Sequence, residues 1–160
     1  LRVFGAALSP TSAWQILQGV ETLGLRMERH CSNALAVATF LKNDNRVAWV
    51  NYPGLTDHPQ HALMTSQMRG ASGLLTFGVK GGLAQGVTFI ESAKFMSHLV
   101  NIGDTRTLIS HPASTTHRQL DSHQQLAAGV GPDMIRISVG LEHIDDILWD
   151  IDQALEKATH

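Results

Sequence analysis

The sequence predicts an α+β fold in which helices cover one face of a mostly antiparallel sheet of about four strands. Segments with strand character alternate with helical ones, but without regular βαβ repeats and without the glycine pattern of a phosphate loop. The chain has 160 residues, of which 43% are hydrophobic, so it is long enough to bury a sizeable core. We therefore expect one α+β layer.

The N-terminal part predicts a long helix. Leu1 to Leu8 is an interrupted apolar segment, and because the chain starts with leucine we expect it to be a piece of a longer protein. Ser9-Pro10 then provides an N-cap and a first helical residue. Apolar or small residues follow at helical spacing: Ala13, Leu17, Val20, Gly24, Met27, Cys31, Ala34, Ala38 and Leu41.

One helix of about 30 residues would be about 45 Å long, too long for one small domain to cover. Its first half is therefore expected to pack on a domain or subunit outside this chain. The alternative is a helix that breaks near Gly19 or Gly24, since glycine is costly inside a helix.

The other elements follow from turn residues and periodicity. Asn43-Asp44-Asn45 should end the first helix, and the apolar stripe of a last helix begins at Ile144, with Asp145 and Asp146 near its positive N-terminus. Between these points we expect strands at 46–52, 73–80, 99–101, 107–110 and 134–139, and helices at 59–68, 83–98 and 122–128.

Charge and cysteine content exclude several classes of protein. The net charge is −2 and no Lys/Arg-rich run is present, so nucleic acid is not an expected partner. Cys31 is the only cysteine, which excludes an internal disulfide and favours a reducing compartment. No apolar stretch approaches the length of a membrane span and no signal peptide is visible, so we expect no membrane contact and a cytoplasmic location.

Arg136 is the most informative single residue. It lies inside Met134–Gly140, an otherwise apolar and β-branched run, and a buried guanidinium requires a facing anion because it cannot lose its charge. That anion could be a ligand. The structural alternatives are an arginine on the open face of a half-exposed strand and an arginine paired with an internal acid.

Other candidate motifs have simpler explanations. Six acidic residues lie between Glu142 and Glu156, and their spacing opposes the apolar stripe of the last helix, which favours a solvated face over an acidic site. The segment Gly78–Gly82 lacks the spacing of a phosphate loop and is interpreted as a strand-to-helix turn.

His111 and His117 are six residues apart around three hydroxyl side chains. Zinc would need further ligands at recognisable spacing, and Cys31 is distant in sequence. We expect no metal here and favour hydroxyls that bind loop backbone or a ligand. Asn101, beside the Gly103-Asp104 turn, should stand at a strand end where its polar atoms can meet a ligand.

Five segments together resemble the Cys/Met-metabolism family of pyridoxal-phosphate (PLP) enzymes over nearly the whole chain. Within that family the sequence is most similar to the O-acetylhomoserine and O-succinylhomoserine sulfhydrylases. The segments are Gly5–Pro10, Gln18–His30, Asn101–Asp104, His111–His117 and Arg136–Asp146.

The resemblance implies the C-terminal part of a type I PLP-dependent fold. Residues 1–42 would connect two domains through the long helix, residues 43–160 would form the substrate-side domain, and the PLP-binding large domain would be absent. The Schiff-base lysine would lie upstream, since Lys42, Lys80, Lys94 and Lys157 do not match its motif. The chain alone should then bind no cofactor and be inactive, whereas the parent enzyme would be a homotetramer.

The same resemblance assigns substrate-binding roles. Arg136 matches the arginine that holds the amino-acid α-carboxylate, a role that suits a bidentate guanidinium. Asn101 matches a position that assists at this carboxylate, and Thr116 matches a threonine at the edge of the active site. Val100 stands where cystathionine γ-lyases have glutamate, which argues against cystathionine as the substrate.

The resemblance therefore implies a parent enzyme that replaces the acyl group of an O-acyl-homoserine with sulfide or methanethiol, yielding homocysteine or methionine. Three alternatives remain open. They are elimination of the methionine γ-lyase type, a free-standing module that binds carboxylates through Arg136, and a zinc protein that uses His111 and His117.

Overall fold

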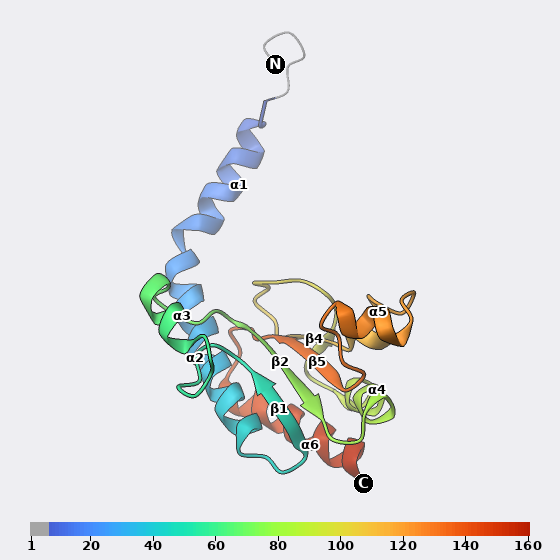
Figure 1. The fold of residues 1–160 in the computed structure, drawn as a ribbon. Coiled ribbons are helices and arrows are strands. Elements are labelled where there is room, and N and C mark those ends of the chain that lie inside the picture. The colour runs from blue at the N-terminus through green and yellow to red at the C-terminus, as the bar shows by residue number, and fades with distance from the viewer. Residues whose placement is uncertain (1–6) are drawn as a thin grey trace.

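A computed structural model describes residues 7–160, so most of the Leu1–Leu8 segment and the start of the Gly5–Pro10 motif lie outside the described residues. The predicted α+β class is confirmed (Figure 1). The elements in chain order are α1 (Pro10–Glu21), α2 (Leu23–Lys42), β1 (Val47–Asn51), α3 (His61–Gln67), β2 (Leu74–Val79), α4 (Leu83–Ser92), β3 (Ser97–His98), β4 (Leu108–Ser110), η1 (Pro112–Ser114), α5 (Ser122–Ala127), β5 (Met134–Ser138) and α6 (Ile144–Thr159).

The N-terminal helix is broken, which corrects the expected single helix. Ser9 caps α1 as predicted, because its hydroxyl accepts the Ser12 N–H at 3.1 Å. The break falls at Thr22, between the two glycines of the alternative prediction, and α2 continues in nearly the same direction. No residue of α1 is buried, and Figure 1 shows this helix projecting away from the sheet.

The sheet has five strands in the order β1-β2-β5-β4-β3, close to the predicted number of about four. The first three pairings along this order are antiparallel, and the short β3 runs parallel to β4. The pairing of β1 shifts between Val47 and Trp49, and such a bulge at a sheet edge limits pairing with another chain. β5 is therefore the central strand, flanked on both sides by antiparallel partners.

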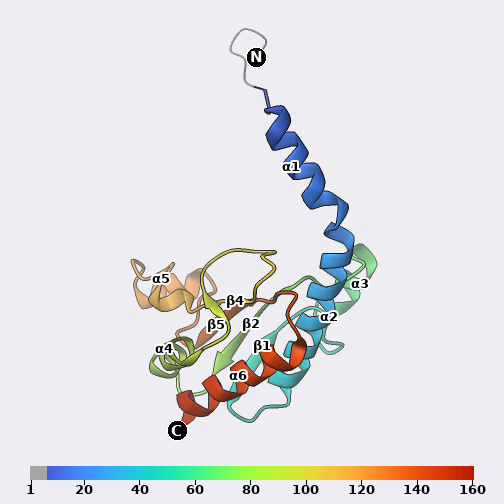
Figure 2. The same ribbon diagram turned by 180° about the vertical axis from the view of Figure 1, so that it is seen from behind.

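Within residues 7–160, helices cover one face of this sheet and leave the other without a helix. Figure 2 shows α6 in front of the strands, whereas in Figure 1 it lies behind β1 and β2. Alternate residues of β2 and β5 are buried on this side against α2, α4 and α6, and Phe77 packs edge-on against Phe89 of α4 with ring centroids 5.5 Å apart. The fully buried side chains of this core include Leu41, Phe77, Phe89, Ile109, Ile135, Ile137, Ile147, Ile151 and Leu155.

The segment after α4 differs from the prediction. α4 ends at Ser92 rather than His98, and 99–101 is loop, while Ser97–His98 forms β3. Asp150 of α6 explains the early end, because its carboxylate accepts the N–H groups of Lys94, Phe95 and Met96 at 2.8 to 2.9 Å. These groups are therefore not available to continue the helix.

The acidic residues of the C-terminal segment do not all lie on a solvated face. Asp145, Asp146, Asp152 and Glu156 are exposed as expected, but Asp150 is fully buried. Glu142 is half-buried, and its carboxylate accepts two hydrogen bonds from Thr107. Both exceptions bind backbone N–H groups near the loop between β3 and β4. Among the described residues, no helix is long and apolar enough to cross a membrane.

Candidate functional site

Arg136 lies on the uncovered face at the centre of the sheet. It pairs with Thr76 of β2 on one side and with Ser110 of β4 on the other, so the three side chains share one face and one row. The arginine is half-buried. Among residues 7–160, no ion pair and no hydrogen bond involves its guanidinium. An internal acidic partner is therefore not seen in this part of the chain. Of the two structural alternatives, the position on the open face of a strand is the one observed.

The row continues onto the edge strand. Asn51 of β1 pairs with Thr76, and its amide oxygen lies 2.8 Å from Nε2 of His58. In the neighbouring row Trp49 lies so close over Gly78 that a Cβ on this glycine would come within 2.2 Å of the indole Nε1. The uncovered face thus presents polar groups around one cation, bounded by a tryptophan.

Asn101 lies in the loop between β3 and β4, not at a strand end. Its side chain is exposed, and its Oδ1 accepts the N–H of Ile102 at 2.8 Å. The loop approaches the uncovered face through Gly103, whose N–H points to the hydroxyl of Ser138 at 3.4 Å. Ser138 is two residues after Arg136 on the same face of β5.

Charge inside this loop is compensated locally. The carboxylate of Asp104 accepts the backbone N–H of Arg106 at 3.0 Å and its side-chain Nε at 3.4 Å. These hydrogen bonds hold the pKa of Asp104 below its usual value. Asp104 therefore stabilises its own turn.

Thr116 follows η1, which packs against β5 beyond Ser110. Thr116 is exposed, and its hydroxyl lies 2.9 Å from Nδ1 of His117. Asn101 and Thr116 thus belong to two loops on either side of Arg136. No hydrogen bond among the described residues joins any two of these three predicted site residues.

His111 is a structural residue. It is fully buried, with Nδ1 2.8 Å from the Ser114 hydroxyl and Nε2 2.8 Å from the carbonyl of Pro132. A Cβ on Gly86 of α4 would reach within 2.6 Å of its ring, so the helix packs directly against it. Both ring nitrogens are thus engaged, and residues 7–160 contain no group of three or more possible metal ligands.

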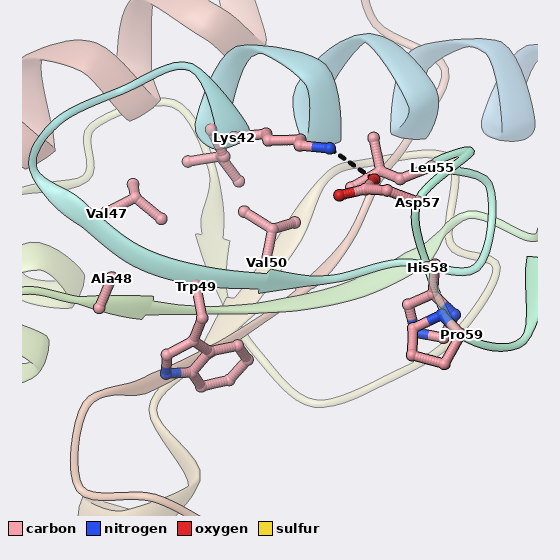
Figure 3. Close-up of a pocket in the computed structure, with 10 residues that line it drawn as sticks. Lys42, Val47, Ala48, Trp49, Val50, Leu55, Asp57, His58 and Pro59 are labelled. Atoms are coloured by element: carbon pink, nitrogen blue, oxygen red, sulfur yellow. Dashed lines mark ion pairs between the residues drawn. The ribbon is translucent and has the colours of Figure 1, made fainter.

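A pocket of about 330 Å³ lies elsewhere, at the edge strand β1 (Figure 3). Val50 points into the side nearer α2, Trp49 points to the opposite side of the strand, and Lys42 forms an ion pair with Asp57 across the opening. None of Arg136, Asn101 and Thr116 lines it.

Comparison with known proteins gives a consistent answer. The model of the family described as Cys/Met metabolism PLP-dependent enzymes matches residues 1–156. The chain belongs to this family. It is 52% identical over 156 residues to O-acetyl-L-homoserine sulfhydrylase 1 of Thermus thermophilus, covering 97% of this chain and 37% of that protein. It is also 43% identical over 153 residues to an L-methionine gamma-lyase of Fusobacterium nucleatum, covering 96% of this chain and 39% of that protein.

The fold agrees with the family. A crystal structure described as an O-acetylhomoserine (thiol)-lyase of Campylobacter jejuni, with N'-pyridoxyl-lysine-5'-monophosphate, matches with a TM-score of 0.87 and 41% identity. The match covers 97% of this chain and 37% of that one. The chain thus spans between a third and two fifths of the length of these relatives. It has the fold of part of a PLP-dependent enzyme.

Two features of the site were missed from the sequence. Thr76 and Ser110 flank Arg136, but the pairing of three strands far apart in the chain cannot be read from any of them alone. Glu142 was grouped with solvated acids although it binds Thr107. The one available signal was its position two residues after Gly140 and before the start of the helix, rather than on the helix itself.

Proposed function

We propose that this chain forms the substrate side of a PLP-dependent enzyme that replaces the acyl group of O-acetyl- or O-succinyl-homoserine with sulfide or methanethiol. The observation that carries this proposal is Arg136, a half-buried cation without an acidic partner among residues 7–160, between two hydroxyl side chains on the uncovered sheet face. Family membership and 52% identity to a sulfhydrylase support the reaction class.

Arg136 would bind the α-carboxylate of the amino-acid substrate. A guanidinium presents two parallel N–H donors to a carboxylate, and its charge needs no further proton transfer. When bound, PLP withdraws electrons from the bonds at the α-carbon. By fixing the carboxylate, Arg136 would also set the orientation of these bonds relative to the cofactor ring.

The two flanking loops would complete the substrate side. Asn101, whose NH₂ group has no partner among residues 7–160, would donate a second hydrogen bond to the carboxylate. Thr116 would line the edge of the site from the other loop. Val100 is about half exposed next to Asn101, and an apolar side chain there suits an uncharged substrate chain better than the second ammonium group of cystathionine.

The residues present fit the substrate but not the aldehyde of the cofactor. None of the four lysines lies on β2, β4 or β5, the strands that surround Arg136. We therefore assign the cofactor to a separate PLP-binding domain, with residues 1–42 as the connection and 43–160 as the substrate-side domain. The exposed Trp14 and Leu17 of α1 would pack on that domain, in a cytoplasmic homo-oligomer.

Elimination of the methionine γ-lyase type is the second candidate, because the chain is 43% identical to such an enzyme. The carboxylate contact would be the same in both reactions. The higher identity to sulfhydrylases favours replacement. Products separate the two, since replacement with sulfide gives homocysteine, whereas elimination gives a 2-oxo acid and ammonia. A free-standing carboxylate-binding module would give neither.

The test is Arg136→Ala in the complete enzyme. Loss of a bidentate charged contact of about 3 kcal/mol should raise KM for O-acetyl-homoserine about 100-fold. The visible absorbance of the lysine-bound cofactor should remain, because Arg136 is not assigned to the cofactor. Arg29→Ala, which removes an exposed arginine of α2, is the matched control and should leave KM within twofold. An unchanged KM in Arg136→Ala contradicts the proposal.

A further inference from the structure

The loop that carries Asn101 is held at its C-terminal root by Glu142. One carboxylate oxygen of Glu142 accepts the Thr107 N–H at 2.6 Å, and the other accepts the Thr107 hydroxyl at 2.8 Å. The same hydroxyl accepts the N–H of Gly140 at 2.9 Å. Thr107 is fully buried, so one side chain joins the loop to the segment that follows β5, the strand of Arg136.

The backbone approaches closely at this point. The Leu141 N–H donates to the carbonyl of Thr105 at 2.8 Å, and a Cβ on Gly140 would lie 2.5 Å from that carbonyl oxygen. No side chain larger than hydrogen fits at Gly140 without a shift of the loop. The position of residues 105–107 relative to β5 is therefore fixed by backbone contact as well as by the carboxylate.

Helix α2 holds the same segment from the other side. Asn33 donates to the carbonyls of Gly140 and Glu142, each at 3.0 Å. Nδ1 of His30 lies 2.6 Å from the carbonyl of Val139, to which it donates. Both side chains are at least 97% buried. The segment 139–142 is thus the point where α2, β5 and the Asn101 loop are joined.

The N-terminal root of the loop is the short β3, and Asp150 anchors this strand by accepting three successive N–H groups directly before it. The tip of the loop is less firmly anchored than either root. Asn101 and Ile102 are exposed, and within residues 7–160 the hydrogen bond that links the tip to the sheet is the long contact of Gly103 with Ser138. The place of Asn101 relative to Arg136 therefore depends on the roots.

We propose that Thr107 and Glu142 are positioning residues that hold Asn101 at a fixed place beside Arg136, so that both side chains meet one carboxylate. This inference rests on the proposed function of Arg136 and Asn101. Neither positioning residue touches the substrate. Their hydrogen bonds order the loop before the substrate arrives, so that substrate binding does not have to order it.

The test compares Thr107→Val with Thr107→Ser in the complete enzyme. Valine keeps the shape but removes the hydroxyl, leaving the Gly140 N–H and one oxygen of Glu142 without their partner, whereas serine keeps these bonds. In Thr107→Val, hydrogen exchange at the Leu141 and Thr107 amides should accelerate about tenfold. KM for O-acetyl-homoserine should rise about tenfold, with kcat changed less than twofold and cofactor absorbance retained. Thr107→Ser should behave like the unmodified enzyme.

Each outcome decides a separate point. Unchanged amide exchange in Thr107→Val overturns the inference, because the hydroxyl then does not hold the loop. Faster exchange with an unchanged KM overturns it too, because the loop then positions nothing. If Arg136→Ala also leaves KM unchanged, the proposed function itself is wrong. Glu142→Gln, which keeps the volume and one acceptor, replaces Thr107→Val if that variant does not fold, with a smaller rise in KM expected.

Discussion

The two faces of the sheet are built from alternate residues of the same strands, yet they differ in how far their side chains find partners within this chain. On the helix side, Ile135 and Ile137 of β5 are fully buried by side chains of this chain. On the other side, Arg136 stands between them in sequence with no charged partner among the described residues. One face is thus packed by side chains of this chain, and the other presents a charge that is unpaired within residues 7–160.

Two arginines show the same contrast. Arg46, in the turn directly before β1, bonds the carboxylates of Asp44 and Asp152 and so ties the start of the strand to α6. Arg136 bonds no carboxylate in residues 7–160, although it lies at the centre of the sheet. Arg46 thus has the environment of a structural arginine, whereas Arg136 has the unpaired environment that our proposal of a ligand-binding role requires.

The largest expected effect is on the covered face. Ile137→Ala removes a fully buried side chain at the centre of the core and should lower the free energy of unfolding by about 3 kcal/mol, because a cavity remains. Arg136→Ala, one residue away, should change it by less than about 0.5 kcal/mol. Urea denaturation of the chain measures both. Equal losses would show that Arg136 also supports the fold and would remove the contrast between the faces.

The sequence predicted the covered face well because its signal is local. Ile147, Ile151 and Leu155 recur at helical spacing and are buried in α6, and the apolar run around Arg136 is β5 as expected. The predicted end of α4 was wrong because the carboxylate of Asp150, far along the chain, accepts the N–H groups of the residues that follow this helix. A tertiary hydrogen bond of this kind leaves no trace in the local pattern.

An intermediate effect is expected at the structural arginine. The hydrogen bond from the Arg46 side chain lowers the pKa of Asp44 in the folded chain. A carboxyl whose folded pKa is lowered stabilises the fold above its unfolded pKa of about 3.9, and this contribution is lost as the pH falls through the folded value. Asp44→Asn should therefore cost about 1 kcal/mol at pH 7, and less below about pH 4.

Urea denaturation at pH 7 and at pH 3 checks this expectation, with Glu156→Gln, an exposed acid of α6 away from the N-terminus of that helix, as the control. A cost that stays constant with pH would show that the Arg46 cluster does not act through the charge of Asp44. In that case charge pairing would not distinguish Arg46 from Arg136.

The site was predicted only where the signal lies in one segment. Arg136 is conspicuous because a charge interrupts an apolar strand, and family resemblance added Asn101 and Thr116. Thr76 and Ser110 became visible only through strand register, since a hydroxyl in a strand is common and carries no signal by itself. The same holds for Thr107, whose partner Glu142 looked like one of several surface acids.

The smallest expected effect on stability comes from a comparison of the same substitution, threonine to valine, at two positions. Thr76 lies on the uncovered face, and its hydroxyl has no hydrogen-bond partner among the described residues, so Thr76→Val should change the free energy of unfolding by less than about 0.5 kcal/mol. The buried hydroxyl of Thr107 makes two hydrogen bonds, so Thr107→Val should cost about 2 kcal/mol. Urea denaturation compares the two. A cost at Thr76 as large as at Thr107 would mean that the uncovered face is held together within this chain. If Thr76→Val instead leaves stability intact but raises KM in the complete enzyme, its hydroxyl serves the ligand beside Arg136 and not the fold.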